Sequence, residues 1–181
     1  RHRLGYSPNL LQDAEDPTAI DQIWVCDITY VRLSQASFAY AAVVMDRFSR
    51  RIDGWKIETH MQEPMVLAAF RMAIRFRQPS PGTVHHSDRG GQYAGKQYRA
   101  VLQRARMQQS MSRPGNCYDH AFMESCFGTI KTELELERFA NAEIARKDIT
   151  AYIRYYNKER LHSSLDYLSP TDFERKVAAR N

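Results

Sequence analysis

Residues 22–33 read Q-I-W-V-C-D-I-T-Y-V-R-L, and this stretch decides how the chain folds. It is rich in Ile, Val, Trp, Thr and Tyr, which favour β-strands. Alternation along a strand puts one set of its residues on a single face: Ile23, Val25, Asp27, Thr29 and Val31. An acid among apolar neighbours is costly unless its charge is matched. Asp27 is therefore either a metal ligand or an edge residue that faces solvent.

Patterns outward from this strand predict the remaining elements. Two more strands, over 38–46 and 51–59, follow after short polar links, which favours an antiparallel meander. Further segments then alternate: a helix over 64–77, a strand over 83–87, a helix over 96–106, a strand over 108–112, and helices over 119–136, 143–156 and 170–177. The prediction is an α/β fold with a mixed five-stranded sheet, three antiparallel strands and then two more, flanked by helices.

Length and composition favour one globular domain with short additions. We expect an N-terminal arm or linker over 1–20, a core over 21–158, and a C-terminal basic segment with a short helix over 159–181. No run of about 18 apolar residues predicts a membrane span. No secretory segment is apparent, which favours a cytoplasmic location. The chain begins with Arg rather than Met, as a fragment of a longer protein would.

Charge and cysteine usage say less about function. The net charge of +5 is compatible with a polyanionic partner, although basic proteins are common. The three cysteines, Cys26, Cys117 and Cys126, lack the close spacing of a structural zinc site. Their odd number favours reduced thiols in a cytosolic setting.

A second informative stretch runs from Val84 to Lys131. Asp88 ends a predicted strand, where ligands gather in sheets of this kind. Glu124 follows with 35 residues between the two acids, in a helix that Asp119 is expected to cap, and Lys131 follows two helical turns later. Such a triple of acids is weak by itself in a chain with 21 acidic residues.

The positions of these acids in the predicted elements strengthen the case for catalysis. One acid lies in a strand, one ends a strand and one lies on a capped helix. Three carboxylates can hold two magnesium ions about 3.5–4 Å apart, which stabilise the attacking and leaving oxygens of a phosphodiester. Lys131 could contact a DNA phosphate.

Other polar residues near these acids have simpler interpretations. Asp46 is expected to cap a turn, and Gly90 is expected to serve a turn. Of His85 and His86, one is expected in the core and one beside the site. His120, one turn before Glu124, could face the site or lie on the helix surface.

Several long runs together resemble a known family. They are W-V-C-D-I-T-Y, D-R-F-S-R-R-I-D-G-W, H-S-D-R-G-G-Q-Y, S-M-S-R-P-G-N-C-Y-D-H-A-F-M-E-S-C-F-G-T-I-K-T-E and Y-Y-N-K-E-R-L-H-S-S-L-D-Y-L-S-P. In this order they resemble the catalytic part of transposases of the insertion-sequence-three family, in the superfamily that includes retroviral integrases. The resemblance covers about residues 8–174.

The resemblance implies a ribonuclease-H-like fold and a DDE triad of Asp27, Asp88 and Glu124. It implies Mg²⁺ or Mn²⁺, with two ions expected, and a reaction in which transposon-end DNA is nicked and its 3′-hydroxyl attacks another phosphodiester. The expected DNA contacts are Lys131, Asn116, Arg113 and Arg89.

The expected partners are DNA and further copies of the chain, in a bacterial cytoplasm at the nucleoid. An upstream helix-turn-helix region, typical of relatives, is not found in this sequence. His120 replaces an expected Asn. Two alternatives stay open: a metal nuclease that only hydrolyses DNA, and a catalytically silent DNA-binding module.

Overall fold

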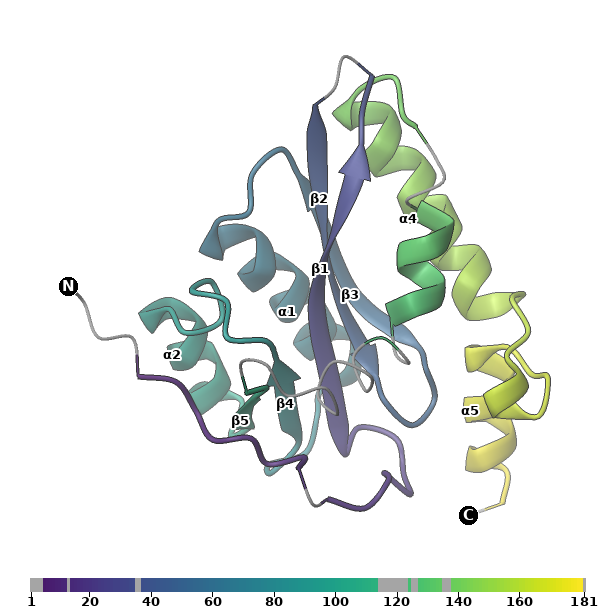
Figure 1. Cartoon of the computed structure of the whole chain (residues 1–181). Helices are drawn as coiled ribbons and strands as arrows, with labels where there is room; N and C mark the ends of the chain where they lie inside the picture. The colour runs from purple at the N-terminus through teal and green to yellow at the C-terminus, as the bar shows by residue number, and fades with distance from the viewer. Residues whose placement is uncertain are drawn as a thin grey trace.

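The fold is built on one mixed sheet of five strands. The computed structural model describes residues 5–12, 14–34, 37–113, 124, 127–134 and 138–180. The strands are β1 (Ile23–Arg32), β2 (Phe38–Asp46), β3 (Ile52–Glu58), β4 (Val84–Ser87) and β5 (Gln108–Met111). They lie in the order β3-β2-β1-β4-β5, with β1, β2 and β3 antiparallel and with β4 and β5 parallel to β1 (Figure 1). The predicted mixed five-stranded sheet is confirmed.

Helices cover both faces of this sheet. They are α1 (Glu63–Arg77), α2 (Lys96–Arg104), α4 (Ala142–Lys158) and α5 (Pro170–Ala178), together with a helical segment over 127–134 and a short 3₁₀ turn, η1 (Ser163–Leu165). α1 and α2 lie on one face, and segment 127–134 and α4 lie on the other (Figure 1). The predicted cap of the 119–136 helix, Asp119, lies outside the described residues.

Alternation along β1 assigns its side chains to two separate cores. Trp24 and Cys26 pack under α1 and α2, beside Phe70 and Tyr98. Gly54 of β3 lets α1 approach closely, since a Cβ there would lie 2.1 Å from the carbonyl oxygen of Ala69. The backbones of β3 and α1 are therefore in close contact at Gly54, where a larger side chain would not fit.

The opposite face of β1 packs against segment 127–134 and α4. Its core residues include Val25 and Val31 of the sheet and Phe127, Ile130 and Ile149 of the helices. By the alternation of the strand, Asp27 points to this same face. Segment 127–134, which packs on this face, is therefore placed to contact Asp27.

A buried ionic network fixes α5 and α1 to the strand ends. The Arg77 guanidinium lies 3.0 Å from an Asp21 oxygen, 2.9 Å from a Glu174 oxygen and 3.6 Å from an Asp53 oxygen. Arg51 also contacts Asp53 and Glu174. Burial raises the pKa of Asp53 to about 8 in spite of the two guanidinium groups.

Two connecting segments have contacts that bear on the sequence predictions. Asp46 accepts hydrogen bonds from the Asp21 N–H, and from the N–H and hydroxyl of Ser49, so its predicted turn-capping role is confirmed. The N-terminal segment runs beside β5, where the Pro8 carbonyl accepts from the Met111 N–H and Ser110 Oγ accepts from the Leu10 N–H.

Candidate active site

The parallel pairing of β1 and β4 brings two of the predicted acids together. Cys26 pairs with Ser87 at the end of the ladder, so Asp27 and Asp88 occupy the next pair of positions. Neighbouring strands lie about 4.8 Å apart, and side chains in register point to the same face. Two carboxylates from distant parts of the sequence therefore stand next to each other at the carboxyl end of β4.

Asp27 is held on the central strand, with β2 on one side and β4 on the other. The sequence allowed Asp27 to be an edge residue that faces solvent, and this central position excludes that interpretation. Its side chain is 15% exposed, and its Oδ1 accepts from the Ile28 N–H at 2.8 Å. Its Oδ2 lies 2.6 Å from Lys131 Nζ. The ammonium of Lys131 thus supplies the positive charge that a partly buried carboxylate needs.

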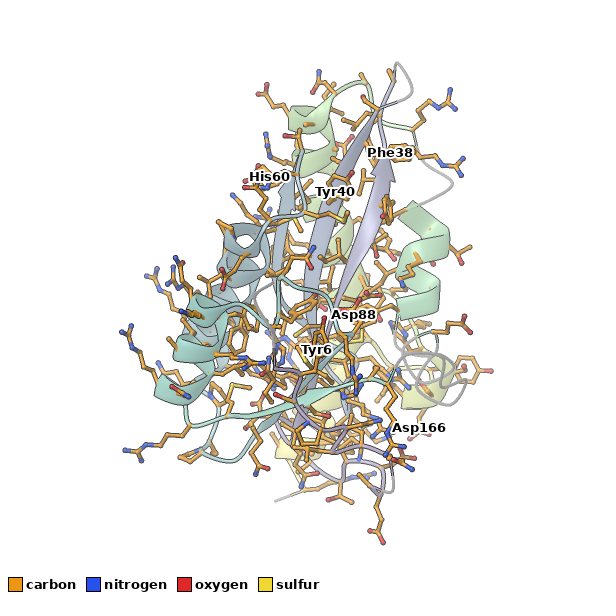
Figure 2. The ribbon with its side chains drawn as sticks, turned by 60° about the vertical axis from the view of Figure 1, so that its left-hand side comes forward. Tyr6, Phe38, Tyr40, His60, Asp88 and Asp166 are labelled. Carbon is orange, nitrogen blue, oxygen red and sulfur yellow. The ribbon has the colours of Figure 1, made fainter. Side chains whose placement is uncertain are left out.

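Asp88 lies at the surface, directly after β4, near the middle of the molecule (Figure 2). Its Oδ1 accepts from the Gly90 N–H at 2.9 Å, and this contact confirms that Gly90 belongs to a turn. Loss of water raises the pKa of Asp88, and the nearby Asp27 carboxylate acts in the same direction. The Gly90 N–H and the Lys131 ammonium oppose this rise. The two acids therefore share one electrostatic site.

Glu124, the third predicted acid, is helical and exposed. Within the part of the chain that the structure describes, no three acidic, histidine or cysteine side chains lie close enough to share a metal ion. The chemistry of the pair formed by Asp27 and Asp88 nevertheless fits a hard cation, because both offer carboxylate oxygens and Asp27 already faces a positive charge. The donor set is thus partly assembled by the sheet itself.

The two histidines before Asp88 have different roles. His85 is fully buried among aromatic rings, its Nε2 lies 2.7 Å from the Tyr98 hydroxyl, and burial lowers its pKa to about 3. His86 lies on the same face of β4 as Asp88. Its ring nitrogens bond Ser110 Oγ at 2.8 Å and Ser112 Oγ at 3.0 Å. His86 therefore ties the end of β5 and the chain beyond it to the strand that carries Asp88.

The predicted DNA-contacting residues are only partly brought to the pair of acids. Lys131 contacts Asp27 directly, a contact that its spacing from Glu124 did not suggest. Arg89 follows Asp88 directly in the sequence, and its guanidinium lies 5.4 Å from the centre of the Tyr6 ring. Arg113 is exposed and hydrogen-bonds the Gln12 side chain. Asn116 lies outside the described residues.

Comparison with known families agrees with this geometry. The model of the Integrase core domain matches residues 17–117, which include Asp27 and Asp88, and a second Integrase core domain model matches residues 105–170.

Similar proteins include the "Transposase for insertion sequence element IS904" of Lactococcus lactis, which is 41% identical over 93% of this chain and 67% of its own length. The "Transposase InsF for insertion sequence IS3A" of Escherichia coli is 39% identical over 98% of the chain and 62% of its own length. The chain thus spans about two thirds of the relatives it matches.

Solved structures of similar fold are viral integrases. The HTLV-2 integrase catalytic core domain in complex with magnesium has a TM-score of 0.64 at 14% identity, over 85% of this chain and 96% of the other. A chain of the simian T-cell lymphotropic virus intasome, solved in complex with PP2A regulatory subunit B56 gamma, has a TM-score of 0.68 at 12% identity, over 96% of this chain and 59% of the other. These likenesses confirm the ribonuclease-H-like, integrase-type fold.

Family models cover most of the chain, transposases share about two fifths of its residues, and the sheet matches that of integrase cores. The resemblance found in the sequence is therefore confirmed: this chain belongs to the integrase core family, among the DDE transposases of bacterial insertion sequences.

Proposed function

We propose that this chain is the catalytic core that nicks transposon-end DNA and joins the freed 3′-hydroxyl to another phosphodiester. The observation that carries the proposal is the adjacency of Asp27 on β1 and Asp88 directly after β4, one position beyond the Cys26–Ser87 pair, beside the Lys131 ammonium. A pair of carboxylates with a matched positive charge suits a cation-dependent reaction on a polyanion. In this proposal Glu124 completes the triad.

Asp27, Asp88 and Glu124 would hold Mg²⁺ or Mn²⁺, as two ions. When bound, such ions stabilise the attacking and leaving oxygens of a phosphodiester. The HTLV-2 integrase core, which has the same fold, was solved in complex with magnesium. Carboxylates on rigid strands support this role, because strand positions fix the donor oxygens before DNA arrives.

Lys131 has a second task in this proposal. Its ammonium neutralises Asp27 in the protein alone, at 2.6 Å. If Asp27 held a cation, Lys131 would be free to contact a DNA phosphate as a point charge. Arg89, Arg113 and Asn116 are proposed to contact the DNA near the same acids.

The proposed partners are DNA and further copies of this chain. The viral integrase of similar fold was solved as part of an intasome. The transposases that this chain resembles come from bacteria, so the proposed setting is the bacterial cytoplasm, where the nucleoid supplies both donor and target DNA. Within the described part of the chain, the structure contains no helix that is both long and apolar enough to span a membrane.

The test is strand transfer with terminal-repeat DNA and Mg²⁺ or Mn²⁺, with Ca²⁺ as a control for binding without turnover. Asp27→Asn, Asp88→Asn and Glu124→Gln are each expected to abolish nicking and joining. Asp148→Asn, which changes an exposed acid of α4, is the matched control. Nicked DNA without a joined product would favour the nuclease alternative. DNA binding without metal-dependent cleavage would favour the silent module.

A further inference from the structure

A polar cavity lies on the far side of segment 127–134 from Asp27. It has a volume of about 460 Å³ and is formed where the β2–β3 turn meets the end of α4 and the loop that precedes α5. Its described lining includes Arg50, Thr129, Arg160, His162, Ser164 and Tyr167. Figure 1 shows the β2–β3 turn, the end of α4 and the loop before α5 on the same side of the molecule, at the lower right of the view. Among the described residues of the triad and its expected DNA contacts, none lines this cavity.

The lining is strongly biased towards groups that bind anions. Two arginines line the cavity, and no Asp or Glu is among its described lining residues. Thr129, Ser163 and Ser164 add hydroxyl donors. The neighbouring acid, Asp166, is directed elsewhere, since its Oδ2 lies 3.3 Å from Lys176 Nζ. Arginine with small hydroxyl side chains is a common donor set for phosphate oxygens.

Arg160 is fixed in place at the cavity wall. Its Nε and Nη2 donate to Glu133 Oε1 at 3.1 and 2.9 Å, and its Nη1 donates to the Leu161 carbonyl at 3.3 Å. The Tyr152 hydroxyl donates to the other oxygen of Glu133 at 2.5 Å, so Glu133 accepts hydrogen bonds from both Arg160 and Tyr152. A guanidinium held in this way loses little side-chain freedom when an anion arrives.

The histidine in the wall is neutral at physiological pH. Burial, followed by the nearby charges of Arg160 and Arg50, lowers the pKa of His162 to about 4. Both guanidinium groups therefore act on the same corner of the cavity. Positive charge at that corner comes from the arginines rather than the imidazole, and Glu133 offsets part of it at Arg160.

The size and rim of the cavity indicate more than a free phosphate ion. A volume of about 460 Å³ lies in the range that holds a drug-sized molecule. Leu161 and Tyr167 are 61% and 71% exposed at its edge, where they can pack on a sugar or a base. Thr129 and Lys131 lie on different sides of one helical segment, which separates the cavity from Asp27.

We infer that this cavity binds the sugar–phosphate backbone of a DNA strand, at a nucleotide away from the one that meets the acidic pair. Arg50 and Arg160 would take the phosphate, the hydroxyls of Ser163 and Ser164 would donate to its oxygens, and Tyr167 would cover the sugar. The inference rests on the proposed function, because DNA is the substrate assigned there. It adds a second contact that fixes the strand on both sides of segment 127–134.

The experiment measures binding of a fluorescein-labelled DNA duplex across a salt titration in EDTA, so that metal and cleavage play no part. Arg50→Asn removes a cavity charge at a left-handed position (φ 61°), which Asn tolerates. Arg106→Asn is the matched control, since Arg106 is exposed, has φ 55° and lies after α2. Ser164→Glu adds a negative charge to the cavity, and Ser80→Glu adds one at another exposed serine. Thermal unfolding of each variant verifies that it is folded.

We expect Arg50→Asn and Ser164→Glu each to weaken binding about fivefold, with the salt slope for Arg50→Asn smaller by about 1. Arg106→Asn and Ser80→Glu should bind as the parent does. Equal DNA affinity of the cavity variant and its control in each matched pair would overturn the inference. It would also be overturned if the cavity variants changed self-association and left DNA binding intact. A loss confined to the cavity variants, in a protein whose Asp27→Asn form still nicks DNA, would sink the catalytic proposal and leave the cavity standing.

Discussion

Replacing Lys131 by Met tests the electrostatic logic of the acidic pair most directly. The change removes the ammonium that lies 2.6 Å from Asp27 Oδ2 while keeping most of the side-chain volume. At a separation equal to the spacing of neighbouring strands, about 4.8 Å, two carboxylates would repel each other by about 2–3 kcal/mol at an effective dielectric constant near 20–30. Lys131 and Asp27 are 35% and 15% exposed, so solvent screens part of this effect. We expect a net loss of about 1–2 kcal/mol in the free energy of unfolding without divalent ions.

The same variant makes an opposite prediction for metal binding. In the parent protein an incoming cation has to replace the ammonium at Asp27, and in Lys131→Met it does not. By linkage the affinity for Mn²⁺ should rise by the energy of the lost contact, about 5- to 30-fold for 1–2 kcal/mol. Mn²⁺ should then also stabilise the variant more than the parent.

Two measurements without DNA check this prediction: urea unfolding with and without Mn²⁺, and calorimetric titration with Mn²⁺. Lys147→Met is the matched control, because Lys147 is exposed on α4 and makes no ion pair within the described residues. The reasoning is refuted if Lys131→Met binds Mn²⁺ no more tightly than the parent. It is also refuted if the two lysine variants lose the same stability.

Three further outcomes concern the scaffold. Arg77→Met removes one of the two guanidinium groups that buried Asp53 and Glu174 share, the other being that of Arg51, and should lower the free energy of unfolding by about 3 kcal/mol in urea titrations; a change below about 1 kcal/mol would contradict the buried network. The folded-state pKa of Asp53, about 8, lies above its usual value of 3.8, so its stabilising contribution is complete below pH 4 and is lost as pH rises towards 8. The free energy of unfolding, measured between pH 5.5 and 7.5, should therefore fall by at most about 1.4 kcal/mol per pH unit because of this group. Asp53→Asn should remove that slope. Gly54→Ala should cost about 2–3 kcal/mol, because the new Cβ would meet the Ala69 carbonyl; an unchanged melting temperature would show that α1 can move away.

The sheet could be predicted because its strands carry local patterns. The run around Asp27 alternates and is rich in β-branched residues, and the apolar stretch that follows, β2, lies in the interior of the sheet, between β1 and β3, as its composition favours. The sequence left open whether Asp27 faced solvent at an edge. In the structure β4 pairs with β1, so Asp27 does not lie on an edge strand. The paired residues are about sixty positions apart in the sequence, and no local pattern encodes such a contact.

The site was only partly predictable for the same reason. That Asp88 ends a strand follows from its neighbours, but the contact between Lys131 and Asp27 depends on how segment 127–134 packs on the sheet. The cavity beyond that segment joins Arg50 to His162, which lie more than a hundred residues apart. Arg50 reads in the sequence as a turn residue, and nothing nearby indicates its neighbours.

The ladder between β1 and β4 also determines which changes of chain length this protein can absorb. Side chains of a strand alternate in direction, so a shift of one residue reverses every one of them. An added residue in the stretch between β3 and α1 would be taken up by that connection. A single deletion inside Val84–Ser87 would instead turn Asp88 to the opposite face of the sheet, towards α1 and α2. Such a chain could still fold, yet its two acids would no longer meet.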